Sequence, residues 1–272
     1  EDWTGKEGRE GSVAIGTCAL ATITTAAGNT AVGYMAGQVT TNGDNTAIGY
    51  CAMNCNTSGE ANVAIGCGAS RVGTGARHNV AIGFRALESN TTCGNIAIGY
   101  QAAYNQSTGK CNVVIGCQAM YNGGSGDEFV AVGHKAGYSN NADFNTAIGS
   151  CALYSNTTGT GNLAVGHCSL FASVTSNNNV AVGDEAIRNN TTGCSNVALG
   201  AHALIINTEG AHNQAMGTET LKGNTTGSCN IGIGTEALRT NSTGSSNIAI
   251  GHFAMYANNT TGSNIAIGVC AL

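Results

Sequence analysis

The chain has 272 residues, of which 15 are acidic and 10 basic, and its formal net charge is −5. This charge excludes the basic surface that nucleic-acid-binding proteins use, and 9% charged with 42% hydrophobic residues excludes intrinsic disorder. The longest apolar runs have four or five residues, so no segment reaches the roughly 20 residues that cross a bilayer, and we expect no membrane insertion.

Residues 1–11 precede a repeat, and we expect them to form an N-terminal lead-in segment. From residue 12 to 272 a phrase of the form Asn-x-Ala-Ile-Gly-x-x-Ala-Leu returns every 17 residues, with three steps of 16. A period slightly below 20 suits one coil of a solenoid stacked on the next. The sequence therefore predicts an all-β parallel β-solenoid of sixteen coils that continues beyond Leu272. The central glycines of the coils are Gly16, Gly33, Gly49, Gly66, Gly83, Gly99, Gly116, Gly133, Gly149, Gly166, Gly183, Gly200, Gly217, Gly234, Gly251 and Gly268.

Positions within a coil are counted from the central glycine as position 0. Position −1 is Ile, Val, Leu or Met, and position −2 is Ala except for Val114 and Gly232. Because alternate side chains of a strand face opposite sides, positions −3 to −1 predict a short strand with aliphatic side chains on one face and Ala on the other, both buried. Runs of about five residues between Gly or Asn are too short for helices.

The second half of each coil follows the same logic. Position +3 is Ala except for Ser169 and Thr220, and position +4 is mostly Leu, Met or Ile. This predicts a second short strand that packs its Leu against the Ile of the first strand inside the coil. The central Gly adopts positive φ easily, so we expect it to form the corner between the two strands. Loops such as 156–159, which reads Asn-Thr-Thr-Gly, are expected to be return turns.

Position −4 is Asn except for Ser12 and Phe129. Stacked in register, identical amides can bond along the solenoid in a ladder, or each Asn can open the strand with a local Asx turn. Both interpretations are structural. The clearest candidates for a ladder are Asn62, Asn79, Asn95, Asn196, Asn230 and Asn247.

The alanines at position −2 suggest association between chains. A stripe of exposed Ala along the whole solenoid would be an unusually long apolar patch. Small side chains permit the close approach of sister copies, and a three-fold arrangement closes without a free face. We therefore expect a homotrimer, intertwined or packed, with the alanine stripes against one another.

The segments 62–66, 79–83 and 95–99, which read Asn-(Val/Ile)-Ala-Ile-Gly, resemble the repeats of trimeric autotransporter adhesin heads. With the Asn-Thr-Thr-Gly loops, the chain from about residue 12 to 272 also resembles tail-fibre and related surface proteins of bacteriophages and other viruses. This resemblance implies a left-handed β-roll in a homotrimer, an extracellular place on a virion or cell surface, and a role in attachment. The partners implied are further copies of the chain and a host-surface glycan or protein receptor.

The chain has twelve cysteines but no Cys-x-x-Cys pair, so a zinc site is poorly supported, and no metal or cofactor is expected. Cys151 and Cys168 occupy the same position of consecutive coils. Coils about 4.8 Å apart fall within the Cα separation of about 4.4–6.8 Å that a disulfide needs. The alternative is that these cysteines fill small buried sites.

Candidate contact residues follow the central glycine directly. Tyr34, Tyr50, Phe84 and Tyr100 stand at position +1, where exposed rings could stack on the sugars of a host glycan or, alternatively, cover the coil edge against a loop. We expect His134, His167 and His252, also at position +1, to lie on the outer corner, and we expect the Asn-x-Thr triplets of the loops to be turn residues.

No arrangement of polar residues predicts catalysis, because the polar departures from the repeat are scattered. The sequence predicts a non-enzymatic fibre, an adhesin shaft or head that presents an attachment site on a virion or cell. One alternative is an extracellular filament built by end-to-end stacking of coils, since a terminal coil presents strand edges. The other is an ice-binding solenoid, which the variable loops disfavour.

Overall fold

The computed structural model describes residues 10–23 and 26–272, and this part of the chain contains no helix. It forms two compact units, here called the N-terminal unit (Glu1–Ala131) and the C-terminal unit (Val132–Leu272). The predicted lead-in segment, 1–11, lies outside the described residues except for Glu10 and Gly11.

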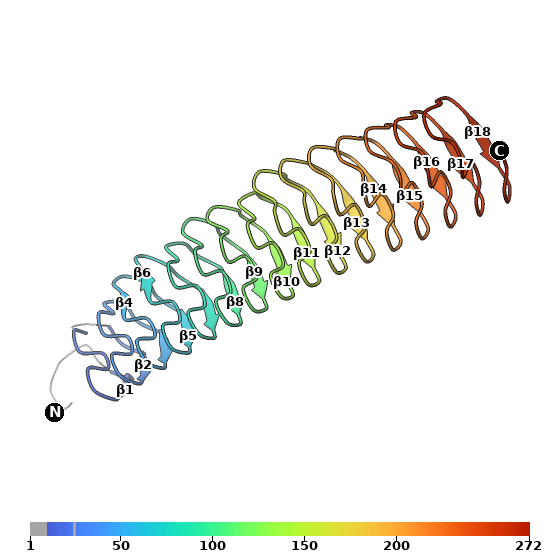
Figure 1. Cartoon of the computed structure of the whole chain (residues 1–272). Coiled ribbons are helices and arrows are strands. Elements are labelled where there is room, and N and C mark those ends of the chain that lie inside the picture. Colours follow the sequence, from blue (N-terminus) through green and yellow to red (C-terminus); the bar gives the residue numbers. More distant parts are fainter. Residues whose placement is uncertain (1–9, 24–25) are drawn as a thin grey trace. The chain divides into compact units, whose positions relative to one another are not determined.

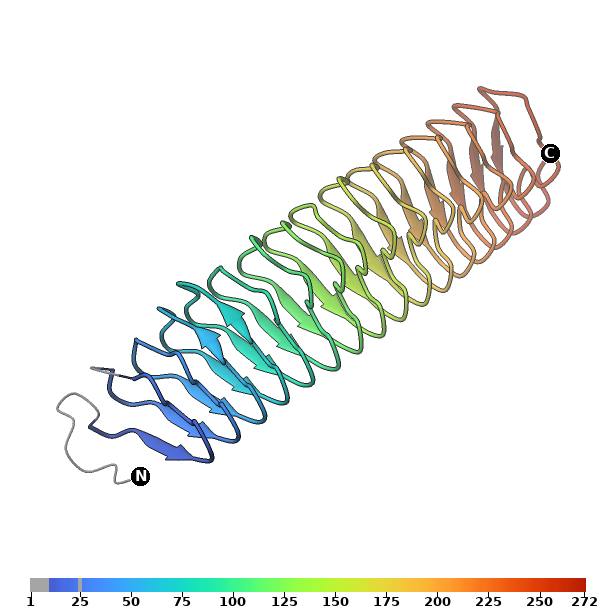
Figure 2. The same ribbon diagram turned by 60° about the vertical axis from the view of Figure 1, so that its left-hand side comes forward.

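The three-residue strands lie along one side of the coils in each unit, and in the N-terminal unit β4 (Cys55–Asn56) and β6 (Val72–Gly73) form a separate two-stranded sheet away from them (Figures 1 and 2). Each repeat contributes one strand of three residues, at positions −3 to −1, and this confirms the predicted parallel β-solenoid. The N-terminal unit contains β1 (Val13–Ile15), β2 (Thr30–Val32), β3 (Thr46–Ile48), β4 (Cys55–Asn56), β5 (Val63–Ile65), β6 (Val72–Gly73), β7 (Val80–Ile82), β8 (Ile96–Ile98) and β9 (Val113–Ile115). Strand β10 (Val130–Val132) crosses the boundary, and the C-terminal unit contains β11 (Thr146–Ile148), β12 (Leu163–Val165), β13 (Val180–Val182), β14 (Val197–Leu199), β15 (Gln214–Met216), β16 (Ile231–Ile233), β17 (Ile248–Ile250) and β18 (Ile265–Ile267).

The strands pair in parallel with identical repeat positions opposite one another. Ala249 of β17 pairs with Ala266 of β18, and Ile250 pairs with Ile267. A step of 16 residues preserves this register, because Ala31 of β2 still pairs with Ala47 of β3. The residue lost in a shorter coil therefore comes from the loop and not from the strand.

The two faces of the sheet are not both buried, which corrects the sequence prediction. The alanines at position −2, such as Ala64, are fully buried inside the coil of their own chain, whereas Ile65 beside it is 37% exposed. The predicted stripe of Ala between sister copies is therefore wrong. The interior of each coil is narrow and in most coils also holds the side chain at position +4. The strand therefore contributes small side chains to it, Ala in fourteen coils and the fully buried Val114 in another, and the side chains at positions −3 and −1 point outward.

The predicted second strand is also wrong in most coils, because positions +1 to +4 form turns. Cys151 and Leu153, at positions +2 and +4, have φ of 56° and 51°, a conformation that costs L residues roughly 1–2 kcal/mol each. Hydrogen bonds between coils offset this cost: Cys151 donates to the carbonyl of His134 and Leu153 to that of Ser169, each at 2.9 Å. Leu153 is fully buried, so the predicted burial of Leu inside the coil is confirmed, but its predicted partner, the Ile of the first strand, points outward, as Ile148 does with 40% of its surface exposed.

The central glycines form the corners, as expected. Gly166 has φ of +133°, and a Cβ atom on it would lie 2.3 Å from the carbonyl oxygen of Gly183 in the next coil. Two requirements therefore select Gly at position 0, the positive φ and the close stacking of successive corners.

The Asn ladder at position −4 is confirmed and is buried. Asn196 donates its backbone N–H (2.9 Å) and its Nδ2 (3.2 Å) to Oδ1 of Asn179, and its Oδ1 accepts the backbone N–H of Asn213 at 3.0 Å. Its Nδ2 also donates to the carbonyl of Gly210 at 2.8 Å. The other predicted ladder residues, Asn62, Asn79, Asn95, Asn230 and Asn247, are equally buried.

A second ladder, at position +7, lies where the sequence predicted only return turns. Asn156 donates Nδ2 to Oδ1 of Asn140 at 2.6 Å and to the carbonyl of Gly159 at 2.8 Å. Asn156 is fully buried, so the Asn-x-Thr triplets at this position are structural, which agrees with the expectation that they serve the turns.

Candidate functional site

The four aromatic side chains predicted to contact glycans lie in one column of the N-terminal unit and are exposed. Tyr34 and Tyr50 stack with ring centroids 5.3 Å apart and an angle of 14° between their planes. Phe84 and Tyr100 stack with the same separation and an angle of 10°. The exposed fractions run from 40% for Phe84 to 57% for Tyr50. Each ring therefore gives one face to its partner, and glycan contact remains a prediction.

The phenol of Tyr50 is also affected by its neighbours. Electrostatic interaction with the Cys51 side chain, followed by a hydrogen bond to the same side chain, raises the pKa of Tyr50. The phenol therefore stays protonated and neutral at physiological pH.

A second aromatic column, at position +5, was not predicted, although the recurrence of aromatic residues five positions after Gly indicates it. In the C-terminal unit its ends are covered by cations: Lys135 lies 5.9 Å from the ring of Tyr138, and Arg188 lies 5.7 Å from that of Phe171. Because neighbouring rings and cations lie against the faces of Tyr138, Tyr154 and Phe171, these three rings offer mainly their edges to solvent. The stacked pairs are Tyr104–Tyr121 in the N-terminal unit, and Tyr138–Tyr154 and Tyr154–Phe171 in the C-terminal unit.

Positions +2 and +5 also carry an ion-pair network in the C-terminal unit. Glu219 accepts hydrogen bonds from Lys222 Nζ at 2.8 Å and Arg239 Nε at 2.9 Å, and these bonds lower its pKa to about 2. Arg239 further contacts Glu236 (3.3 Å) and donates to the hydroxyl of Tyr256 (2.8 Å). The carboxylate of Glu219 is therefore fixed as an anion, which suits a structural role better than proton transfer.

The three histidines at position +1, His134, His167 and His252, are exposed on the corner, as expected. His167 Nδ1 lies 2.9 Å from Asp184 Oδ1, and His202 lies 3.8 Å from the other oxygen of Asp184. Within residues 10–23 and 26–272, no group of three His, Cys, Asp or Glu side chains has the arrangement that could hold a metal ion.

The cysteines of the predicted disulfide are both free thiols in the structure. Cys168 is buried, and burial, followed by the charge of Cys151, raises the pKa of its thiol. Cys168 thus resembles the small buried side chain of the alternative interpretation, whereas Cys151 is half-buried. Their bridging under oxidising conditions remains a prediction.

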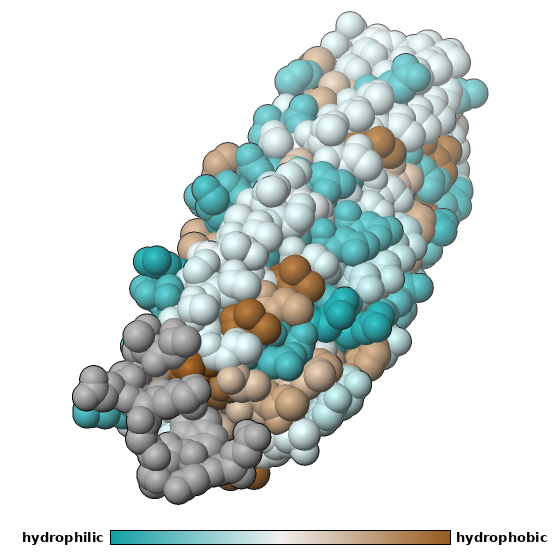
Figure 3. Space-filling view, turned by 90° about the vertical axis from the view of Figure 1, so that its left-hand side faces the viewer, coloured by the Kyte–Doolittle hydropathy of each residue, from teal (hydrophilic) through white to brown (hydrophobic). Residues whose placement is uncertain are grey.

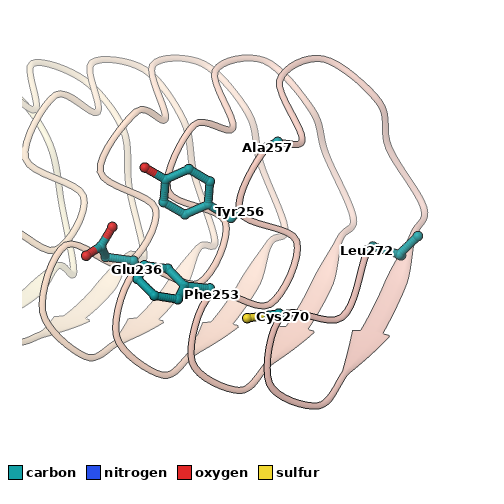
Figure 4. Close-up of a pocket in the computed structure, with 6 residues that line it drawn as sticks. All are labelled: Glu236, Phe253, Tyr256, Ala257, Cys270 and Leu272. Atoms are coloured by element: carbon teal, nitrogen blue, oxygen red, sulfur yellow. The ribbon is translucent and has the colours of Figure 1, made fainter.

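A shallow recess of about 470 Å³ lies beside the last coils of the C-terminal unit. The rings of Phe253 and Tyr256 lie on one side of it, with Cys270 and Leu272 on the other (Figure 4). Its one carboxylate, Glu236, pairs with Arg239. The recess therefore lacks the convergent free polar groups that a catalytic site requires.

The outward face of the sheet is an extended apolar surface in each unit. Its side chains come from positions −3 and −1, with Thr or Gln as the only polar types and no charged residue. On the face shown in Figure 3, hydrophobic side chains instead occur in patches among hydrophilic and near-neutral ones. The most exposed members at position −1 of strands with a neighbour on both sides are Ile48, Ile65 and Ile115 in the N-terminal unit, and Ile148, Leu199, Met216, Ile233 and Ile250 in the C-terminal unit, each 37–40% exposed.

No family model matches the chain, and no curated protein matches it. In the described part of the chain, no helix has the length and apolar character needed to cross a membrane. The fold and the surface of the coils are therefore the basis for a functional proposal.

Proposed function

We propose that this chain is a non-enzymatic fibre segment that assembles with two further copies of itself and holds an attachment site on a virion or cell surface. The observation that carries the proposal is the uncharged aliphatic face of the sheet, which runs along each unit in the register of the coils. This face, and not the alanine row, is the surface we assign to contact between copies.

Burial of the exposed part of this face would favour association. Full burial of an Ile side chain is worth about 1.5–3 kcal/mol, so burying the exposed 37–40% of one side chain contributes roughly 0.6–1.2 kcal/mol. The five strongly exposed residues of the C-terminal unit then contribute about 3–6 kcal/mol per chain, to which position −3 and the N-terminal unit add. Part of this gain is offset by the entropy lost on association.

Three copies are the arrangement we favour because a three-fold axis closes on itself and leaves no part of the interface free. The ladders and corners inside the coil supply stiffness without a partner. Attachment is the proposed role since each unit is a repetitive solenoid with fixed ion pairs, and the described residues bring together no convergent reactive groups. The exposed aromatic column of the N-terminal unit supplies side chains suited to contact with a glycan.

The assembly is tested by sedimentation equilibrium of the chain with one charge placed on the sheet face. Wild-type protein is expected at about 81 kDa, three times the 27.1 kDa of one chain. Ile233→Asp places a carboxylate on the aliphatic face and is expected to shift the mass toward one chain. The matched control is Ile206→Asp, since Ile206 has nearly the same exposure, 40% against 38%, but lies at position +6 outside the sheet.

A wild-type monomer, or equal effects of the two substitutions, would contradict the proposed interface. A species that keeps growing with concentration would instead support an open filament built by end-to-end stacking. Thermal hysteresis of the wild-type solution would support ice binding, for which the structure offers no observation in favour.

A further inference from the structure

The exposed aromatic column at position +1 of the N-terminal unit is interrupted by one small side chain. Tyr50, Cys67 and Phe84 follow the central glycines of three consecutive coils, whose strands β3, β5 and β7 pair in register. The backbone continues this register past the corner, because Gly68 donates to the carbonyl of Tyr50 at 2.9 Å and Arg85 to that of Cys67 at 3.0 Å. Cys67 is exposed.

Aromatic faces bound this interruption on both sides. Tyr50 gives one face to Tyr34, and Phe84 gives one face to Tyr100. Both pairs stack along the direction in which coils succeed one another, so the second faces of Tyr50 and Phe84 are turned toward the coil of Cys67. The two rings stand two coils apart, about 9.6 Å at roughly 4.8 Å per coil. We call this space, with Tyr50 and Phe84 as walls and Cys67 as floor, the ring notch.

The notch has the thickness of one ring. The stacked pairs on either side have centroid separations of 5.3 Å, so one ring between Tyr50 and Phe84 would have nearly the same spacing to each wall. The high exposure of both walls, 57% for Tyr50 and 40% for Phe84, leaves the notch open to solvent.

Arg85 borders the notch on one side. Its Cγ lies 3.3 Å from the place where a Cβ on Gly68 would stand, so its stem fills the space above that glycine. Its guanidinium lies 5.4 Å from the ring of Phe84 and 3.4 Å from the hydroxyl of Tyr104, in the coil that follows Phe84. The guanidinium lies against the ring of Phe84, with Nε 3.7 Å from Glu88 Oε2, so it forms part of the Phe84 wall of the notch and supplies N–H donors at the rim.

We propose that the ring notch binds one pyranose ring of a glycan between the faces of Tyr50 and Phe84. The negatively charged face of an aromatic ring attracts the weakly positive C–H groups of a sugar ring, and Arg85 and the Tyr50 hydroxyl can bond to sugar hydroxyls at the rim. The proposal rests on the attachment role given above and specifies its ligand class and its site.

The pyranose proposal is tested by a substitution that fills the ring notch and keeps the aromatic column at position +1 continuous. Cys67→Tyr would place a ring between Tyr50 and Phe84 and extend the aromatic stack, which the fold already accepts at both neighbouring positions. Cys67→Ala keeps the notch open. Cys117→Tyr is the matched control, since Cys117 stands in the same column beyond Tyr100, outside the notch, and is exposed.

Binding is measured by saturation-transfer NMR of the whole chain with the methyl pyranosides of galactose, mannose and N-acetylglucosamine, and folding by the circular dichroism melting curve. We expect wild type, Cys67→Ala and Cys117→Tyr to bind at least one of the three, with the sugar C–H protons shifted upfield by the ring currents. Cys67→Tyr is expected to melt at or above the wild-type temperature and to bind at least about tenfold more weakly, the factor that 1.4 kcal/mol represents.

A second measurement uses the thiol at the floor. Alkylation by iodoacetamide, followed at peptide level by mass spectrometry, is expected to slow at Cys67 in the presence of the bound pyranoside and to be unchanged at Cys117. Undiminished binding by folded Cys67→Tyr, equal protection of both thiols, or binding of phenol in place of every pyranoside would overturn the proposal. Loss of the trimer in sedimentation would instead count against the assembly and leave the notch measurement intact.

Discussion

Removing the side chain of one ladder amide has a cost that follows from its hydrogen bonds. In Asn196→Ala four bonds are lost, the two that Nδ2 donates and the two that Oδ1 accepts from the backbone N–H and Nδ2 of Asn213. The backbone N–H of Asn213 loses this acceptor and stays buried, a cost of about 1–3 kcal/mol, and the other three bonds are worth about 0.5–1.5 kcal/mol each. The expected loss is about 3–7 kcal/mol.

Asn196→Asp is a sharper test because its effect depends on pH. The new carboxylate would face Oδ1 of Asn179 and the carbonyl of Gly210, the two acceptors that Nδ2 of Asn196 now contacts. Burial and these acceptors disfavour the charged form, so the folded pKa of the introduced carboxyl is expected above its unfolded value of about 3.9. The protonated acid can donate one of the two hydrogen bonds that the amide Nδ2 donates now. Relative stability is therefore greatest below pH 4 and falls as pH rises, by about 1.4 kcal/mol for each unit of raised pKa.

The assay is urea unfolding followed by far-ultraviolet circular dichroism at pH 3 and pH 7, with each variant compared with wild type at the same pH. Asn189→Ala, which removes a half-buried amide at position +6 of the same unit, is the control and is expected within about 0.5 kcal/mol of wild type. The reasoning is refuted if Asn196→Asp is as destabilised at pH 3 as at pH 7, or if Asn196→Ala matches the control.

Two further substitutions test the corner and the ion-pair network. Gly166→Ala and Gly268→Ala share φ of +133°, but only the former places Cβ 2.3 Å from a carbonyl oxygen; the latter has no atom nearer than 3.8 Å. Gly268→Ala is expected to lower the free energy of unfolding by about 1–3 kcal/mol through backbone strain, and Gly166→Ala is expected to lower it clearly more. Equal losses of the two variants in urea unfolding would show that the contact between coils does not contribute. Glu219, whose folded pKa of about 2 lies below the ordinary 4.5, contributes stability above pH 4.5 that is lost as pH falls toward 2; because the pair is partly exposed this amounts to about 1 kcal/mol or less. Glu219→Gln should remove that part of the acid dependence, and an unchanged difference in urea midpoint between pH 6 and pH 3 would disprove the contribution.

The repeat predicts the register of the strands well, because a fixed period places identical repeat positions opposite one another in successive coils. The pairing of Ala249 with Ala266, the positive φ of Gly166 and the ladder at Asn196 all follow from residues that recur at one position. Each of these predictions requires only that successive coils have the same conformation, and none depends on what that conformation is.

The face of the strand that points into the coil was predicted wrongly. The alternation of side chains along a strand distinguishes its two faces but does not say which of them faces the interior. From the sequence alone, either Ala64 or Ile65 could point into the coil. The choice depends on the volume of the interior, which is set by the turn that follows Gly66. This turn uses positive φ at two residues that are not Gly, as at Cys151 and Leu153, and no residue preference predicts this conformation. The bonds between coils that stabilise it are visible only once the coils are stacked.

The division between inner and outer positions explains where function can vary in such a chain. The interior accepts few changes, because Asn196 bonds to the coils before and after it and the corner at Gly166 leaves no room for a methyl group. Positions +1, +2 and +5 face outward and carry rings, thiols and ions on the same backbone. At these positions the effect of a residue depends on its neighbours in the column. Cys67 has a small side chain, and because it stands between Tyr50 and Phe84 it leaves a space the thickness of one ring. Specificity in this architecture would therefore be encoded by the order of side chains along a column rather than by any single coil.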